Sequence, residues 1–158
     1  QEKNLMSENF LVKKYKEKVE LLENNSVLVN INDWKKISQF IFKSKFDYLM
    51  CITSYDLEAD NKIGLAYNFF STTKKEYLEV RLEFNSTDEV FSIAEIWRAA
   101  DWHEREAYDL MGVIFDGHPD MKRILLPDDW DGHPLRKDWK EPEYYNGMPV
   151  PKDKTYWE

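Results

Sequence analysis

The sequence contains one cysteine, Cys51, among its 158 residues. A single cysteine excludes a disulfide within the chain, and it excludes an iron–sulfur cluster held by thiolates of this chain alone. No apolar run approaches the roughly 18 residues that a membrane-spanning helix requires. The glycine-rich phosphate-binding patterns GxxxxGKS/T and GxGxxG are both absent. The first residues also lack the charged and apolar regions of a secretory signal.

Positive charge is scarce, and the formal net charge is −8. This balance argues against binding to nucleic acid, whose phosphates require a basic surface, and against direct docking on an anionic membrane. Residues 1–80 contain no arginine, whereas residues 97–139 contain four of the five arginines and all three histidines. Because the planar guanidinium suits fixed pairing with carboxylates, we expect residues 97–139 to be the geometrically demanding part of the chain.

Hydrophobic periodicity predicts an α+β fold. Amphipathic spacing indicates helices over residues 7–23 and Trp34–Lys43, the second capped by Asn32 or Asp33. Strands are predicted at Val27–Val29, Phe46–Thr53, Lys62–Phe70 and Tyr77–Phe84, with turns at Asp56–Asn61 and Ser71–Glu76. We therefore expect two layers, a small mixed or antiparallel sheet with helices on one face.

A third helix is predicted from the capping-box pattern of Ser92 and Glu95 as far as Met111, with Gly112 in the C′ position. Such a helix of 20 residues would be about 30 Å long. Three shorter features are expected after it: a strand at Val113–Phe115, a turn at Asp116–Gly117, and one or two helical turns within Pro119–Leu125.

The end of the chain has a different composition. Five of the six prolines occur from Pro127 onward, which disfavours a regular helix or central strand there. The same segment is rich in aromatic residues: Trp130, Trp139, Tyr144, Tyr145, Tyr156 and Trp157. We expect an α+β domain over residues 1–126 and an extended arm over residues 127–158 that packs on a partner. A partner interface is favoured over a carbohydrate or base-stacking surface, because aromatic residues and arginine are common interface anchors.

Glu104 lies in the middle of the apolar stripe of the third helix and therefore requires a buried partner. Asp101, Arg105 and Asp109 follow one another at i,i+4 spacing on the neighbouring face, as an acid–base–acid ladder would. One interpretation is a catalytic acid/base cluster formed with His103.

The favoured interpretation is a structural network that fixes the helix against the loop over residues 117–126. In this network Arg123 or Lys122 would pair with Glu104 or Glu106. No nucleophile accompanies the cluster, and structural ion networks are commoner than catalytic ones.

A metal site is disfavoured. His103 and Glu104 begin an HExxH pattern, but position 107 is alanine, so the second histidine ligand is missing. His118 and His133 each stand in a Gly-His-Pro triplet, which is typical of turns. The acidic run around Asp128 lacks the spacing of an EF-hand loop.

Two segments together resemble a known family. They are Glu104-Arg105-Glu106-Ala107-Tyr108-Asp109-Leu110-Met111 with His118, Lys122, Ile124 and Leu125, and the continuation Leu126-Pro127-Asp128-Asp129-Trp130-Asp131-Gly132-His133-Pro134-Leu135-Arg136-Lys137-Asp138. This pattern resembles the 30-kDa subunit (designated C) of respiratory complex I.

The resemblance implies a hydrophilic subunit in the peripheral arm of a proton-translocating NADH:quinone oxidoreductase. Family members carry no cofactor of their own, whereas the whole complex uses FMN, iron–sulfur clusters, NADH and a quinone. Their C-terminal segment packs along the 49-kDa subunit, and subunits D (the 49-kDa subunit) and B together shape the quinone pocket. Membrane contact would occur only through the complex, on the cytoplasmic side of a bacterial plasma membrane or on the mitochondrial matrix side.

Under this interpretation we expect no catalytic, cofactor-binding or metal-binding residue. The structural signature network would consist of Glu104, Arg105, Glu106, Asp109, His118 and Arg123. The partner interface would consist of Trp130, His133, Arg136, Lys137 and Trp139. Two alternatives are kept: the equivalent subunit of an energy-converting hydrogenase or of a ferredoxin- or F420-linked membrane dehydrogenase, and a small acid/base hydrolase using Glu104 and His103.

Overall fold

A computed structural model describes residues 9–22, 26–57 and 61–150. Within these ranges the main sheet has the strand order β1-β2-β5-β4-β3. Its strands are β1 (Val19–Leu21), β2 (Val27–Val29), β3 (Tyr48–Asp56), β4 (Lys62–Ser71) and β5 (Glu76–Asn85). The pairs β3–β4, β4–β5 and β1–β2 are antiparallel, whereas β2 runs parallel to β5. The sheet is therefore mixed, and the predicted α+β class is confirmed.

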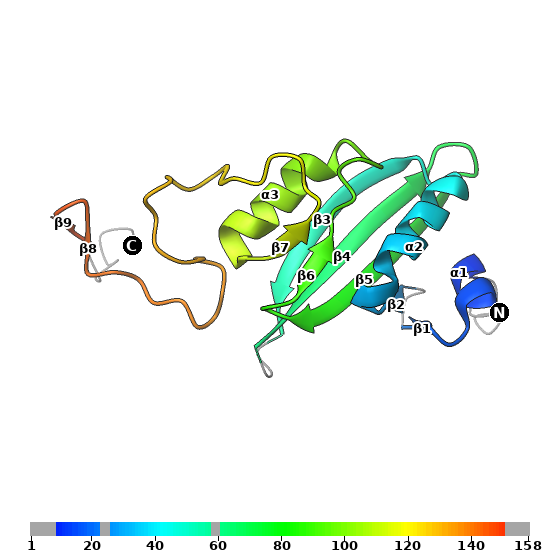
Figure 1. The fold of residues 1–158 in the computed structure, drawn as a ribbon, viewed down its shortest axis with the longest axis horizontal. Coiled ribbons are helices and arrows are strands. Elements are labelled where there is room, and N and C mark those ends of the chain that lie inside the picture. The colour runs from blue at the N-terminus through cyan, green and yellow to red at the C-terminus, as the bar shows by residue number, and fades with distance from the viewer. Residues whose placement is uncertain (1–8, 23–25, 58–60, 151–158) are drawn as a thin grey trace, which may run out of the picture.

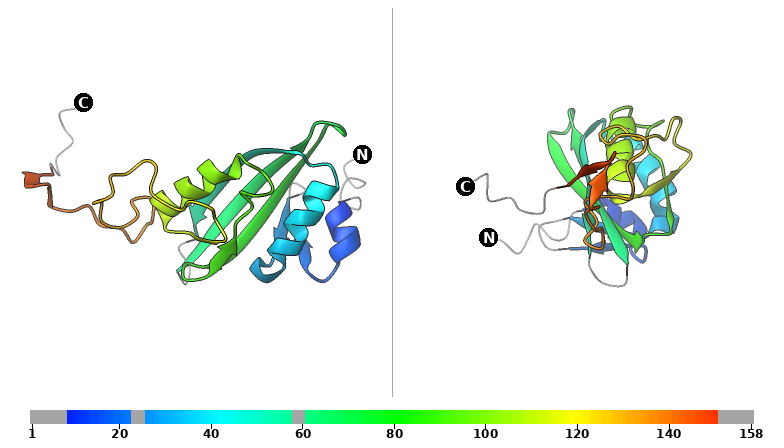
Figure 2. Two further views of the ribbon diagram at one scale, coloured as in Figure 1. Left: turned by 45° about the horizontal axis from the view of Figure 1, so that its top comes forward. Right: turned by 90° about the vertical axis from the view of Figure 1, so that its left-hand side faces the viewer.

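Strict alternation builds the core on one face of this sheet. In β5, Leu78, Val80 and Leu82 are buried and the residues between them face the other way. Helix α2 (Ile31–Lys43) lays Trp34 and Ile37 onto this face, and helix α3 (Ala100–Met111) packs beside β3. Figures 1 and 2 show both helices on the same side of the long strands, as the predicted two-layer arrangement requires.

The first predicted helix is too long. Helix α1 covers only Phe10–Tyr15, and β1 begins at Val19 in the stretch that was expected to remain helical. Pairing with β2 aligns Val19 with Val29 and buries both side chains against the core. Tertiary pairing therefore overrides the local helical periodicity. The predicted helix end at Asn24–Asn25 lies outside the described residues.

Helix α2 agrees with its prediction but begins earlier. Asn30 caps the helix, and its side-chain oxygen accepts a hydrogen bond from the backbone N–H of Asn32 at 3.0 Å. A side-chain oxygen in this position satisfies one of the free N–H groups of the first turn. The cap is thus neither of the two residues expected.

Helix α3 begins at Ala100, so the predicted capping box at Ser92 is wrong. The segment before the helix forms turns, and its Trp97 indole Nε1 donates to the carbonyl of Phe46 at 3.0 Å. The helix ends as predicted at Gly112, which adopts φ 74° in the left-handed region. Its 12 residues make it about 18 Å long rather than 30 Å.

After α3 the chain forms β7 (Ile114–Asp116), which pairs in parallel with β6 (Glu89–Phe91). The helical turns predicted within Pro119–Leu125 do not form, and this segment is an irregular loop. The arm then leaves the end of α3 and runs away from the sheet to a small hairpin of β8 (Tyr144–Tyr145) and β9 (Met148–Pro149) (Figure 1). The tail residues Tyr156 and Trp157 lie outside the described ranges. No described helix is long and apolar enough to cross a bilayer.

Candidate functional site

Asp109, near the end of α3, is the centre of the first polar cluster. Its side chain is fully buried, and its Oδ2 accepts hydrogen bonds from the backbone N–H groups of Ile124, Leu125 and Leu126 at 3.0, 2.8 and 2.9 Å. Its Oδ1 accepts a hydrogen bond from Arg123 Nη1 at 2.8 Å. Burial alone would raise the pKa of Asp109, but these four donors outweigh it and hold the pKa below its usual range. The loop after Met121 is irregular because its amides point at this carboxylate rather than along a helix.

Arg123 links the same cluster to the arm. Its Nη2 donates to the carbonyl oxygens of Trp130 at 3.1 Å and Gly132 at 3.2 Å. Nδ1 of His133 lies 2.9 Å from the carbonyl oxygen of Asp109, one of the carbonyls that a helix end leaves without a helical partner. The arm is therefore fastened to the C-terminal turn of α3.

Gly112 shows how closely the arm approaches. A Cβ atom at this position would lie 2.6 Å from Cδ2 of the His133 ring, in addition to the strain of the positive φ. Glycine is thus required at this position both for the left-handed conformation that ends the helix and for the space that the His133 ring occupies.

Glu104 forms a second, separate cluster one turn earlier on α3. Its side chain is fully buried and accepts hydrogen bonds from Ser92 Oγ at 2.5 Å and from the N–H of Ile93 at 2.8 Å. Burial raises the pKa of Glu104 to about 7, while these two hydrogen bonds act in the opposite direction. His118 Nε2 lies 3.9 Å from Glu104 and 3.4 Å from Asp101 Oδ1, and its Nδ1 accepts the N–H of Asp120 at 3.1 Å.

The predicted pairing of Glu104 or Glu106 with Arg123 or Lys122 is therefore wrong. Arg123 binds Asp109, and Lys122 forms an exposed ion pair with Asp120 at 2.7 Å. The sequence signal that was missed is Ser92. The sequence spacing predicts a helix cap at Ser92, whereas its hydroxyl donates a hydrogen bond to the Glu104 carboxylate, 12 residues away.

The expected acid–base–acid ladder does not form either. Arg105 donates instead to the backbone carbonyls of Lys122 at 3.2 Å and Arg123 at 3.4 Å, and its guanidinium lies 5.4 Å from the centre of the Trp102 ring. Carbonyl contacts of this kind fix the loop against the helix. Glu106 is exposed and belongs to neither cluster.

The residues predicted for the partner interface contact the chain itself in several places. Arg136 Nη2 donates to Asn61 Oδ1 at 2.7 Å, and the N–H of Lys137 donates to Asp56 Oδ2 at 3.1 Å. Trp130 stacks on Trp139 with ring centres 6.1 Å apart. The first part of the arm thus has internal order as well as contacts to the domain.

The arrangement offers little for acid/base catalysis. His103 lines a groove beside β3, whereas the Glu104 carboxylate is bonded to Ser92 and Ile93 inside the domain. The proposed catalytic pair is therefore separated. Across the described ranges, no three His, Cys, Asp or Glu side chains gather as metal ligands.

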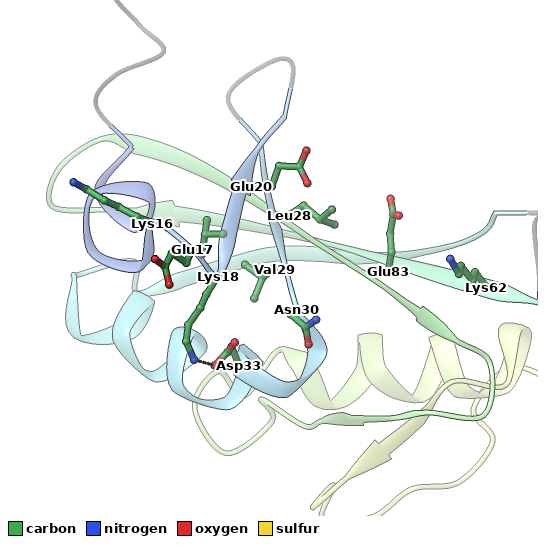
Figure 3. A pocket seen from close by; sticks show the side chains of 11 residues that line it. Lys16, Glu17, Lys18, Glu20, Leu28, Val29, Asn30, Asp33, Lys62 and Glu83 are labelled. Atoms are coloured by element: carbon green, nitrogen blue, oxygen red, sulfur yellow. Dashed lines mark hydrogen bonds and ion pairs between the residues drawn. The ribbon is translucent and has the colours of Figure 1, made fainter.

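A groove of about 640 Å³ lies beside β1, β2 and β5 (Figure 3). It is lined by charges of both signs, among them Lys16, Glu20, Lys62 and Glu83, and Lys18 forms an ion pair with Asp33 at its rim. Opposite charges that face one another in solvent give no single preference for a charged ligand.

Comparison with known proteins gives a consistent picture. The family model described as "Respiratory-chain NADH dehydrogenase, 30 Kd subunit" matches residues 27–145. The subunit named C of the NADH-quinone oxidoreductase of Chloroherpeton thalassium is 42% identical over 135 residues, which cover 79% of this chain and 56% of that protein. The protein of the same name from Moorella thermoacetica is 44% identical over 89 residues, covering 56% of this chain and 60% of that protein. The chain thus spans little more than half the length of these relatives.

Solved structures share the fold. A trypsin-resistant fragment of Nqo5 superposes with a TM-score of 0.61 at 21% identity, covering 70% of this chain and 96% of that one. A chain of an archaeal membrane-bound sulfane sulfur reductase superposes with a TM-score of 0.71 at 21% identity, covering 82% and 81%. Because the family model covers most of the sequence, the chain belongs to the family of the 30 Kd subunit of respiratory-chain NADH dehydrogenase.

Proposed function

We propose that this chain is a structural subunit, without a cofactor of its own, in the peripheral arm of a proton-translocating NADH:quinone oxidoreductase. The observation that supports the proposal most directly is that residues of the structural signature network form hydrogen bonds to the backbone of the chain itself. Asp109, Arg105 and Arg123 are all bonded to backbone groups of the chain, and those bonds fasten the loop and the arm to α3. Charged groups held in this way position a segment rather than react with a substrate.

Residues 127–158 would form the arm that lies on neighbouring subunits. Two features support this role. The arm carries exposed apolar side chains, with Leu135 57%, Tyr144 66% and Met148 64% exposed. Its anchored part at Trp130 and His133 fixes the direction in which it leaves the domain. Exposed apolar groups on a pre-ordered segment are suited to a partner surface.

The partners we propose are subunits D (the 49-kDa subunit) and B, which would form the quinone site of the complex. Quinone reduction, FMN and iron–sulfur clusters would reside in other subunits. The membrane would be reached only through the complex, at its cytoplasmic face in a bacterium. Among possible electron donors we favour NADH, because relatives at 42% and 44% identity are named as subunits of NADH-quinone oxidoreductases. The sulfane sulfur reductase chain shares the fold alone and does not favour a different donor.

Affinity purification of the tagged full chain from a host that makes the other subunits tests the proposal. We expect subunits D and B to co-purify with the tagged chain. The chain purified alone should show neither a flavin nor an iron–sulfur absorption band, and it should not oxidise NADH. A stable chain that never captures subunits D and B, or one that oxidises NADH alone, would overturn the proposal.

A further inference from the structure

The two outer strands of the main sheet differ in length and charge. At one edge, β1 has three residues, includes Glu20, and follows Lys18. At the other edge, β3 has nine residues, and the eight from Tyr48 to Tyr55 include no charged residue and no proline. Exposed strand edges in proteins are usually short, charged or interrupted by proline, because their free N–H and C=O groups otherwise pair with another chain. The β3 edge has none of these three safeguards.

A groove of about 330 Å³ runs along this edge. Its wall on the sheet side consists of four consecutive residues, Cys51, Ile52, Thr53 and Ser54. Successive side chains of a strand point to opposite faces, so four in a row can line one groove only along the strand's edge.

The side chains agree with this geometry. Asn68 Nδ2 donates to Cys51 Sγ at 3.3 Å on one face of the sheet, whereas Ile52 is buried in the core on the other. What both residues present to the groove is therefore main chain. Four residues of strand are about 13 Å long, which is enough for several ladder hydrogen bonds.

The opposite wall determines which occupant fits. It comes from α3, through His103, Glu106, Ala107 and Leu110, and Leu135 of the arm closes one end. Ala107 and Leu110 are apolar, and the lining residues include one acid, Glu106, but no lysine or arginine. Glu106 is exposed, and no ion pair joins it to another described residue. The groove thus combines backbone pairing, an apolar floor and one unneutralised negative charge.

Within the described residues, no strand pairs with the outer edge of β3. The arm passes the end of β3, where Lys137 N–H meets Asp56 Oδ2 at 3.1 Å, but no described strand other than β4 pairs with β3. The β-bulge in β3 lies between Leu49 and Cys51, before the grooved part. The bulge therefore protects only the first end of the strand.

We propose that β3 receives an extended segment of a partner subunit as a sixth strand, with a lysine or arginine of that segment placed against Glu106. This inference rests on the proposed function, since it takes the occupant from the assembled complex. Main-chain hydrogen bonds to residues 51–54 would supply affinity, and the α3 wall would select the side chains.

Amide hydrogen exchange of the full chain, alone and within the purified complex, tests the proposal. We expect amides within residues 51–54 to exchange about tenfold more slowly or better in the complex, because edge N–H groups gain partners. The other sheet edge, at residues 19–21, is the internal control and should not change. Unchanged exchange at residues 51–54 in a complex that does contain the chain would overturn the sixth strand while leaving the proposed function intact.

Charge reversal at the groove gives a second, independent reading. Glu106→Lys should lower the yield of complex several-fold and remove the added protection at residues 51–54. Glu95→Lys makes the same charge change at an exposed site away from the groove and should leave both unaffected. A folding defect is excluded if both isolated variants unfold at the same midpoint as the wild-type chain.

Three other results would overturn the proposal. Equal losses of complex in both variants would mean that Glu106 has no specific role. Concentration-dependent protection of residues 51–54 in the isolated chain would identify a second copy as the occupant. Failure of subunits D and B to co-purify would overturn the proposed function together with this inference.

Discussion

Replacing Asp109 by asparagine should destabilise the domain more than other conservative surface or core changes in α3. The carboxylate is fully buried and accepts four hydrogen bonds, three from backbone N–H groups and one from Arg123. Asparagine keeps only one acceptor oxygen. If that oxygen faces the three amides, its NH2 group faces the Arg123 guanidinium, so that two donors meet. If the amide is turned round, the NH2 group faces the three backbone donors instead.

The expected loss follows from the ion pair. Asp109 is fully buried and Arg123 is only 17% exposed, so removing the carboxylate leaves a largely buried cation without its partner. Breaking a buried pair in this way costs about 3–5 kcal/mol. Domains of this kind have a total stability of about 5–15 kcal/mol, so the variant would lose a large fraction of it.

Urea unfolding followed by tryptophan fluorescence measures the change at pH 7. With a slope of about 2 kcal/mol per M, the midpoint should fall by about 2 M. Asp128→Asn is the matched control, because Asp128 is exposed and should change the free energy of unfolding by less than about 0.5 kcal/mol. A loss below about 1 kcal/mol for Asp109→Asn would refute the argument that this ion pair is structurally important.

The pH dependence provides a check of sign. The pKa of Asp109 lies below its ordinary value of 3.8, so the stability that it contributes is fully present above pH 3.8. That contribution is lost as the pH falls through the lowered pKa of the folded state. The difference in the free energy of unfolding between wild type and Asp109→Asn should therefore become smaller in acid. A difference that stays constant with pH would contradict the lowered pKa of Asp109.

Glu104→Gln should have the opposite pH dependence. Burial raises the pKa of Glu104 from 4.5 to about 7, so its contribution to wild-type stability is greatest below pH 4.5. Between pH 4.5 and pH 7 the free energy of unfolding of the wild type should fall by about 3 kcal/mol relative to that of the glutamine variant. Unfolding curves measured over a series of pH values would show this change. If Glu104 served a hydrolase, the glutamine variant would lose turnover in addition to this change in the pH dependence of stability. Gly112→Ala should cost at least about 1–2 kcal/mol from the positive φ alone, and His133→Ala in the same chain should relieve any excess due to the 2.6 Å contact. A chain ending at Leu126 should still fold, with lower stability because Arg123 loses two carbonyl partners, and should capture less of the 49-kDa subunit in a pull-down assay; complete unfolding would show that the arm belongs to the core.

The parts of the fold that were predictable depend on neighbours in the sequence. Alternation predicted β5 because every second side chain enters one core. The capacity of glycine for positive φ predicted the end of α3 at Gly112. Burial of Glu104 also followed from its place in an apolar stripe. In each case the deciding interaction is local or averaged over a whole face.

The parts that failed depend on single distant partners. Ser92 and Glu95 have the spacing of a capping box, but the Ser92 hydroxyl bonds to Glu104, and no local pattern distinguishes the two uses. Residues 119–125 have acceptable helical composition, yet the backbone N–H groups of residues 124–126 donate hydrogen bonds to Asp109 instead. One hydrogen-bonded turn is a weak competitor against a buried carboxylate, because hydrogen bonds to charged groups are the stronger ones.

Helix α3 holds two fully buried carboxylates whose pKa values are shifted in opposite directions. Burial acts on both, but Glu104 has two hydrogen-bond donors, whereas Asp109 has four, including a guanidinium. The pKa of Glu104 is raised and that of Asp109 is lowered for this reason. Opposite shifts often mark an acid and a base of an active site, but here each carboxylate is bonded to a different backbone segment, at residues 92–93 and 124–126. The two carboxylates are therefore best explained as structural hydrogen-bond acceptors. Glu104 holds the segment that leads into the helix, and Asp109 holds the loop and arm that follow it.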